Sequence, residues 1–280
     1  MVRILVAGGE PGVGASAVAV GLAHRLAYAG HAVRLVRLAG DERAGGDAHA
    51  FARLDFAAAA DGPLAPDALP DSDELLVIEA SPGADAAALA AAIGAKLVAV
   101  TGARDAAPAG ATLVIASRAR RAGPLAIPED RTLAAPTVGR LIAASGARVL
   151  TRSAEGDGAL CEHIVIGAIS HDSNVPYFDR FPRKAVVTRA ERVDVALAAL
   201  RTDTACLILA GGADPSPYLL DRVAAGRGTT LLVAPEGTVE TVRELEGCFG
   251  GEPFAGDAKA ARAGALLALA VDDAALATLL

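Results

Sequence analysis

The sequence lacks tryptophan, is only 3% aromatic and contains three cysteines, Cys161, Cys206 and Cys248. An odd number of cysteines without paired metal-ligand spacing argues against a disulfide framework and a zinc site, so we predict three buried thiols. No apolar run approaches the roughly 18 to 20 residues that span a bilayer, which excludes a membrane span, and we expect no membrane partner. The chain starts with a strand-like segment and not with an export signal, so we expect a cytoplasmic protein.

Basic residues are fewer than acidic residues in this chain. The chain has 26 Lys and Arg against 33 Asp and Glu, a net charge of −7, and only three of the 26 are Lys. The basic residues are scattered except for the short run SRARR at 117–121. Because nucleic-acid binding needs a basic face or stripe, we expect no nucleic-acid partner.

Short apolar runs alternate with Ala-rich helical stretches, a pattern that predicts an α/β fold with parallel sheets. The length of 280 residues accommodates two domains. Basic residues and prolines after the strand at 112–117 favour a boundary there. We predict a first domain at 1–123, a linker at 124–135 and a second domain at 136–280, with C-terminal helices from Lys259 onward packing on the second domain.

One feature of the first domain is unusual. Parallel neighbouring strands need a crossover of a dozen or more residues, commonly containing a helix. Only residues 102–111 separate the strands predicted at 96–101 and 112–117, and only 118–123 precede the next short strand. The sequence therefore predicts that two crossover helices are missing. The alternative is that one of these runs is not a strand, or pairs antiparallel.

A glycine-rich loop, GGEPGVGAS at residues 8–16, follows the first predicted strand and opens into a helix. Such a loop cradles phosphate groups with backbone N–H groups. Against the phosphate-loop pattern G-x-x-x-x-G-K-[ST], Gly9, Gly14 and Ser16 match, whereas Ala15 replaces the Lys that grips phosphate. This chain supplies its positive charge almost always as Arg, so Ala at position 15 indicates a lost phosphate clamp. A loop with only a structural use is the alternative to weak nucleotide binding.

Two charged residues at predicted strand ends could assist this loop. Arg37 ends the second strand, and Glu79 ends the third, where an acid could hold Mg²⁺. The alternatives are a solvated Arg and a Glu that caps the turn after it. The candidate cofactor-binding residues are therefore Gly9, Gly12, Gly14, Ser16, Arg37 and Glu79.

Six segments carry a family resemblance: GGEPGVGAS, LLVIEASPG, PLAIPEDRTLAAPTVGRL, HIVIGAISHDSNVPYF, KAVVTRAERVDVALAAL and CLILAGGADPSPYLL. In this order they resemble a dethiobiotin-synthetase-like P-loop domain followed by a DRTGG domain. That arrangement is found in the non-catalytic N-terminal portion of long phosphate acetyltransferases and in stand-alone proteins. The resemblance implies a degenerate P-loop parallel-sheet domain followed by a DRTGG-type α/β domain, without the acetyltransferase catalytic domain.

The residues that give the DRTGG family its name are altered here. The Asp-Arg pair reads Glu191-Arg192, and Thr-Gly-Gly reads Ala210-Gly211-Gly212, so the hydroxyl is lost. Open parallel sheets bind ligands beyond the carboxyl ends of their strands. The candidate ligand-binding residues of the second domain are accordingly Ser170, Thr188, Arg189, Arg192, Gly211 and Gly212.

These observations favour a non-catalytic regulatory or interaction protein with no catalytic residues and no metal site. We expect its DRTGG-like domain to sense a small anionic or nucleotide effector or to contact a protein partner. The resemblance also implies a homodimer. The alternative is an ATP-dependent ligase similar to dethiobiotin synthetase, with ATP and Mg²⁺ as cofactors, Ser16 and Glu79 on Mg²⁺, and Arg37 in place of a substrate-side Lys.

Overall fold

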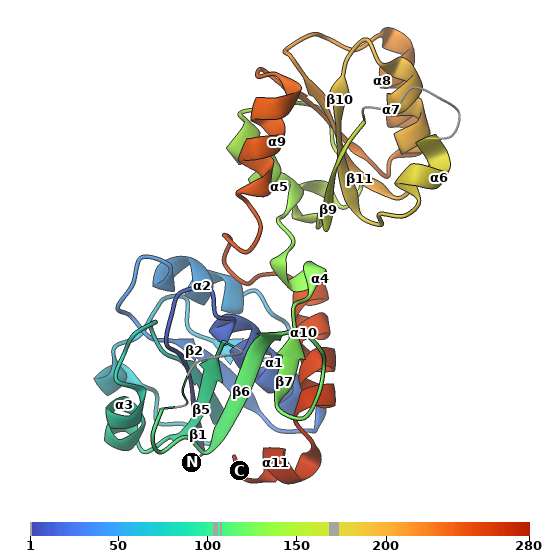
Figure 1. Cartoon of the computed structure of the whole chain (residues 1–280). Coiled ribbons are helices and arrows are strands. Elements are labelled where there is room, and N and C mark those ends of the chain that lie inside the picture. The colour runs from blue at the N-terminus through green and yellow to red at the C-terminus, as the bar shows by residue number, and fades with distance from the viewer. Residues whose placement is uncertain (1, 103–105, 107, 168–173) are drawn as a thin grey trace. The chain divides into compact units, whose positions relative to one another are not determined.

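The computed structural model of the chain describes residues 2–102, 106, 108–167 and 174–280. It divides into two compact units (Figure 1). Met1–Leu133 and Pro253–Leu280 form the first unit, and Ala134–Glu252 forms the second. The second unit is therefore an insertion in the sequence of the first. Within the described ranges, no helix is both long and apolar enough to cross a bilayer.

The first unit contains a sheet of seven described strands in the order β3-β2-β4-β1-β5-β6-β7, and all neighbours pair in parallel. The central strands β1 and β4 consist almost entirely of buried apolar residues, as expected for a parallel sheet covered on both faces. The strands are β1 (Arg3–Gly8), β2 (Val33–Arg37), β3 (Ala58–Ala59), β4 (Leu75–Glu79), β5 (Lys96–Thr101), β6 (Leu113–Ala119) and β7 (Ala126–Pro128).

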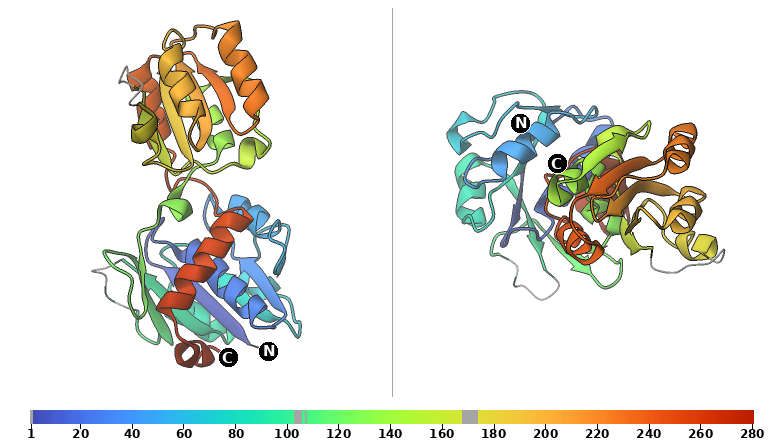
Figure 2. Two further views of the ribbon diagram at one scale, coloured as in Figure 1. Left: turned by 90° about the vertical axis from the view of Figure 1, so that its right-hand side faces the viewer. Right: turned by 90° about the horizontal axis from the view of Figure 1, so that it is seen from above.

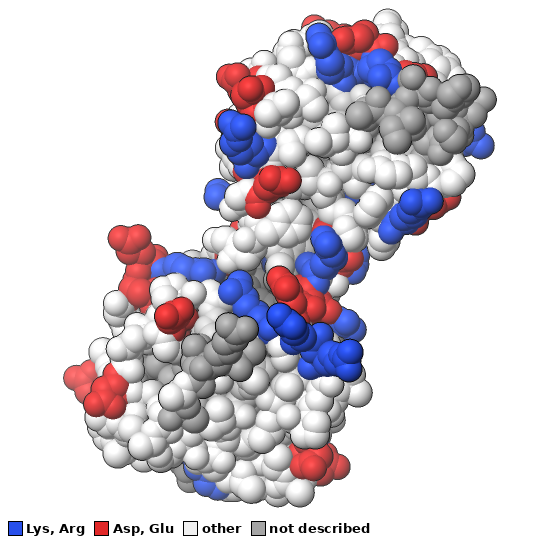
Figure 3. Space-filling model, in the orientation of Figure 1, with Lys and Arg blue, Asp and Glu red and all other residues white. Residues whose placement is uncertain are grey.

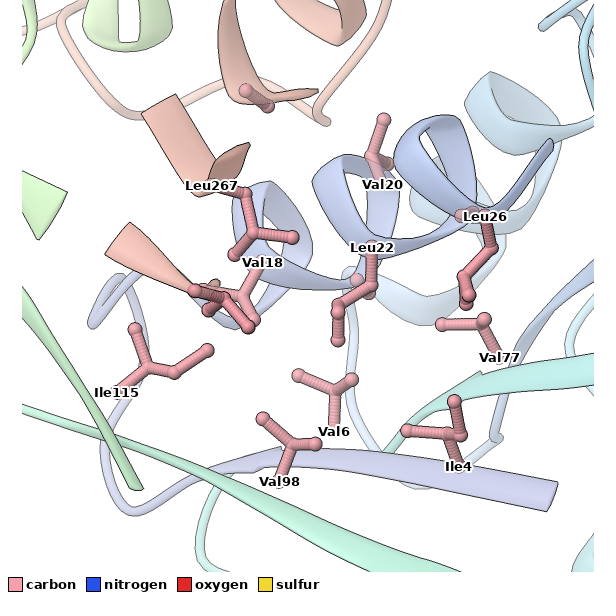
Figure 4. Packing of buried hydrophobic residues seen from close by; sticks show 14 of the residues in the cluster. Ile4, Val6, Val18, Val20, Leu22, Leu26, Val77, Val98, Ile115 and Leu267 are labelled. Carbon is pink, nitrogen blue, oxygen red and sulfur yellow. The ribbon is translucent and has the colours of Figure 1, made fainter. Parts of the chain in front are cut away.

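Helices cover both faces of this sheet. One face carries α1 (Ala15–Tyr28) and α10 (Asp257–Ala270), and α3 (Ala86–Ile93) packs on the other. Figure 2 shows α10 running across the sheet, and Figure 4 shows Leu22 of α1 pointing toward Val6 and Leu267 of α10 lying beside Val18 in the shared core. The remaining helices of this unit are α2 (Ala44–Phe51), α4 (Arg131–Ala134), α11 (Asp273–Ala277) and the 3-10 turn η1 (Pro66–Ala68).

Two glycines let α1 and α10 approach closely. A Cβ atom at Gly21 would lie 2.9 Å from the Ala263 carbonyl oxygen, and one at Gly264 would overlap the His24 ring. A side chain at Gly21 would push the two helix backbones apart, and one at Gly264 would require the His24 ring to move. The packing of α10 on α1 is thus specified by the absence of Cβ atoms at these positions.

The position of the C-terminal segment corrects the sequence prediction. Lys259–Leu280 was predicted to pack on the second domain, yet α10 and α11 belong to the first unit, and Leu266, Leu267 and Leu276 lie in the same core as β1. The predicted linker at 124–135 is also wrong in part, since β7 extends the first sheet and Ile127 is buried in its core. The apolar face of a helix shows that the helix packs against other residues. It does not show which of two sheets the helix covers.

The short connections in the first unit are confirmed as crossovers between parallel strands. β6 pairs in parallel with β5 and with β7, and the described residues of both connections contain no helix. The face beside β6 and β7 is covered by α10 instead, and the Leu125 N–H donates to the Ala270 carbonyl at 2.7 Å. A helix from the far end of the sequence thus covers apolar surface that a crossover helix would otherwise cover.

The second unit has a sheet of five described strands in the order β8-β12-β11-β10-β9. Four are parallel, and the edge strand β8 runs antiparallel to β12. The carboxyl ends of β9 to β12 therefore meet at one edge. The strands are β8 (Arg148–Thr151), β9 (His163–Ile166), β10 (Lys184–Arg189), β11 (Thr204–Ala210) and β12 (Thr230–Ala234).

Helices flank this second sheet on two sides. α5 (Val138–Ser145) and α9 (Thr238–Glu246) pack on one face, and α7 (Val193–Leu200) and α8 (Pro217–Gly226) pack on the other, followed at the edge by α6 (Asn174–Phe178) (Figure 1). A 3-10 turn, η2 (Gly156–Gly158), precedes β9. All three cysteines are free thiols buried in the α5 and α9 core, as predicted. Burial raises the pKa of Cys161 to about 12, so this thiol is chemically inert.

Candidate functional site

The glycine loop lies at the carboxyl edge of the first sheet, between β1 and α1. Gly12 and Gly14 have φ values of 75° and 103°, a backbone region that favours glycine. Gly14 immediately precedes the first residue of α1, so the free N–H groups of the first helical turn open at this loop. A Cβ atom at Gly14 would lie 2.6 Å from the Ser117 hydroxyl, which brings the end of β6 against the loop. Gly9 is exposed with space around it.

The structure brings Ser16, Arg37 and Glu79 together behind this loop. Ser16 is in the first turn of α1, and its hydroxyl donates to Glu79 Oε1 at 2.7 Å. Arg37 and Glu79 are paired residues at the ends of the neighbouring strands β2 and β4. Arg37 Nε lies 3.7 Å from Glu79 Oε2. The predicted grouping of these three side chains at one edge is therefore present.

Two acids that the sequence analysis did not identify complete the cluster. Arg37 donates to Asp41 through Nη2 and to Asp47 Oδ2 through Nε at 3.5 Å. Its Nη1 donates to the Leu38 carbonyl at 2.7 Å and to the Ser81 hydroxyl at 3.3 Å. Arg37 is buried, so the alternative of a solvated strand-end Arg is wrong. No local motif marks Asp41 or Asp47, since their contact with Arg37 depends on how α2 and the segment before it fold over β2.

Three carboxyl groups surround one guanidinium, so the cluster carries an excess of negative charge when all three are ionised. Burial raises the pKa of Glu79 to about 7, against the opposing effect of Arg37, and burial also raises the pKa of Asp47. Among the described residues, Asp47 Oδ1 and Glu79 Oε2 are buried without a hydrogen-bond partner. Such unsatisfied buried groups call for an explanation, for example a bound water, ion or ligand.

The backbone of the loop and the side chains around it differ in how well they suit an anionic ligand. The backbone of the loop fits a phosphate group, because its glycine turns and helix N-terminus present N–H donors. The side chains around it do not complete the usual phosphate grip. Position 15 carries no cation, Arg37 is held by this chain's own acids, and Glu10 is exposed in the loop. A phosphate here needs a positive charge from another part of the chain.

The second predicted site is at the carboxyl edge of the second sheet. Thr188 is buried, and its hydroxyl donates to the Gly167 carbonyl at 3.3 Å, which joins β10 to the end of β9. Arg189 is paired with Ala210 across the sheet, next to the glycine pair. Ser170 lies outside the described residues. The structure therefore places Thr188, Arg189, Gly211 and Gly212 at one edge.

The glycine pair forms a turn between β11 and the end of β12. Gly211 and Gly212 have φ values of 93° and 73°, so both are in the left-handed region. Their N–H groups donate to the carbonyls of Glu236 at 2.6 Å and Ala234 at 2.9 Å. These donors are engaged within the fold, and the arginine side chains are therefore the better candidates to contact an anion.

Both candidate arginines form ion pairs with neighbours in sequence. Arg189 Nε lies 2.7 Å from Glu191, and Arg192 donates to both carboxylate oxygens of Asp194 at 3.1 Å. The Arg189 and Glu191 side chains are 66% and 57% exposed. Exposed pairs of this kind contribute only about 0–1 kcal/mol, so an anionic ligand can exchange for the carboxylate.

Comparison with known proteins identifies the second unit. Residues 140–248 match the family model of the DRTGG domain. The chain is also similar to a crystal structure of the CBS and DRTGG domains of the regulatory region of Clostridium perfringens pyrophosphatase, complexed with its activator diadenosine tetraphosphate. That similarity has 14% identity and a TM-score of 0.38, and covers 43% of this chain and about half (52%) of the other. On the family match, residues 140–248 of this chain form a DRTGG domain.

Proposed function

We propose that this chain is a regulatory protein whose second unit binds a small anionic or nucleotide ligand at the carboxyl edge of its sheet. The observation that carries the proposal is the DRTGG domain at 140–248. The geometry supports it, because four parallel strands end at one edge, where Arg189 is the last residue of β10 and Arg192 follows it. In this function the anionic ligand displaces the carboxylates of Glu191 and Asp194 and binds the guanidinium groups of Arg189 and Arg192 in their place.

The test is calorimetric titration of the full chain with ATP, ADP and diadenosine tetraphosphate. Loss of a hydrogen bond to a charged group corresponds to roughly 1.5–3 kcal/mol, so we expect binding about tenfold or more weaker in Arg189→Ala and Arg192→Ala. Arg201→Ala is the matched control, since Arg201 is an exposed arginine at the opposite end of α7. Equal affinity in wild type and both site variants, or no binding of any of the three compounds, would contradict the proposal.

A second candidate function is phosphate binding at the glycine loop of the first unit, as in the alternative of an ATP-dependent ligase. The observation that favours it is the Ser16–Glu79 hydrogen bond at a loop whose glycine turns are intact. If ATP and Mg²⁺ bind there, Ser16→Ala should weaken binding while Arg189→Ala should not. ATP binding that is unchanged by Ser16→Ala would exclude this candidate.

A further inference from the structure

Three exposed arginines, Arg118, Arg120 and Arg121, follow the buried part of β6, and we refer to them as the arginine turn. Within the part of the chain that the structure describes, none of them forms an ion pair. In contrast, Arg25, Arg34 and Arg262 of the same unit are paired with acids. Figure 3 shows basic side chains, with a few acidic ones among them, gathered on the region of the first unit that carries β6, β7 and α10.

The arginine turn is adjacent to the glycine loop. Ser117 contacts the loop at Gly14, as described above, and Arg118 is the next residue. Arg118 has a φ of 54°, which is uncommon for a residue other than glycine and bends the chain at the end of β6. Since β1 and β6 belong to one parallel sheet, their carboxyl ends share the same edge. The arginine turn is therefore on the side of the sheet where the loop presents its N–H groups.

The charges on the two sides of the loop differ in sign. Behind it lie Arg37 and three carboxyl groups, and among the described residues Asp47 Oδ1 and Glu79 Oε2 are buried without a hydrogen-bond partner. A phosphate group at the loop would be repelled by this cluster unless a cation compensated it. Position 15, which supplies that cation in phosphate loops, is Ala. Arg118 is an exposed arginine and directly follows Ser117, which lies against the loop at Gly14.

We propose that Arg118 supplies the cation for a phosphate-bearing ligand held at the glycine loop, in the role that Lys at position 15 would have. This inference rests on the second candidate function. Arginine suits the role because its planar guanidinium can donate two hydrogen bonds to one phosphate group. Arg120 and Arg121 add a field that attracts anions from solution and that weakens with salt.

The experiment is titration of the full chain with pyrophosphate and with ATP, each with Mg²⁺, at two salt concentrations. Arg118→Ala should weaken binding by about tenfold or more, and Arg118→Lys should retain most of it. Arg53→Ala is the matched control, because Arg53 is an exposed arginine of the same unit that follows α2. Ala15→Lys introduced together with Arg118→Ala should restore binding, which a merely structural role of Arg118 would not allow.

The outcomes separate this inference from the function on which it rests. Wild-type binding that is lost in Ser16→Ala but kept in Arg118→Ala would overturn the inference and leave phosphate binding at the loop in place. Absence of any wild-type binding would overturn both. Loss of binding in Arg118→Ala with no rescue by Ala15→Lys would also contradict the inference, provided thermal unfolding shows that both variants are folded.

Discussion

The buried carboxyl of Glu79 should make the first unit less stable as pH rises. Its pKa is about 7 in the folded chain and 4.5 in a solvated reference. The folded state therefore binds a proton more tightly than the unfolded state, and the free energy of unfolding falls as pH increases between these two values. From about pH 5 to about pH 8.5 this difference in proton binding lowers the free energy of unfolding by roughly 2 to 3 kcal/mol. The side chain is almost fully buried, so solvent screening does not reduce this figure substantially.

Glu79→Gln removes this titration while keeping an oxygen that accepts from Ser16. We expect the variant to be more stable than wild type at the higher pH, with a difference in unfolding free energy that shifts by roughly 2 to 3 kcal/mol over the same pH range. The assay is urea unfolding followed by far-UV circular dichroism, because the chain has no tryptophan. If the two units unfold separately, hydrogen exchange in β1 and β4 isolates the transition of the first unit.

The control for this prediction is Glu10→Gln, which makes the same chemical change at an exposed position of the glycine loop. It should leave the pH dependence of wild type in place. Parallel pH profiles of wild type and Glu79→Gln would refute the reasoning, since they would show that Glu79 does not titrate differently on folding. The raised pKa of Asp47 acts in the same direction, so some pH dependence should persist in Glu79→Gln.

Four further predictions concern the architecture. Gly21→Val should destabilise the first unit by several kcal/mol, about as much as overpacking in a core, and increase hydrogen exchange in α10. A fragment of residues 134–252 should fold alone, whereas 1–133 without 253–280 should lack a cooperative thermal transition, because it lacks α10. Gly212→Val should lower the thermal midpoint of the second unit, since φ there is positive, and Gly226→Val provides a comparison without that constraint. Light scattering should give twice the chain mass of 27.9 kDa if the predicted homodimer forms, and a monomer across micromolar concentrations would count against it.

Features carried by contiguous sequence were predictable. Apolar runs such as Val2–Ala7 and Leu75–Glu79 indicated buried parallel strands, because strands covered on both faces need apolar residues at every position. The glycine loop and the helix after it were recognisable because positive φ and an open helix N-terminus have a local signature. The DRTGG domain was recognisable because contiguous sequence segments carry its resemblance. The short connections around β6 indicated that crossover helices were missing.

Other features were decided only by the tertiary structure. The apolar face of α10 did not indicate in the sequence which sheet it covers, and in the structure it packs on α1, where Gly21 and Gly264 lie opposite backbone and ring atoms far away in sequence. The acids around Arg37 come from different segments, and no spacing rule relates them. Gly211 and Gly212 were predicted as ligand-binding residues, and only the structure shows that their N–H groups donate to carbonyls at and just after the end of β12. Periodicity reports how one segment is buried, whereas partner choice depends on which surfaces are left uncovered after the other segments have packed.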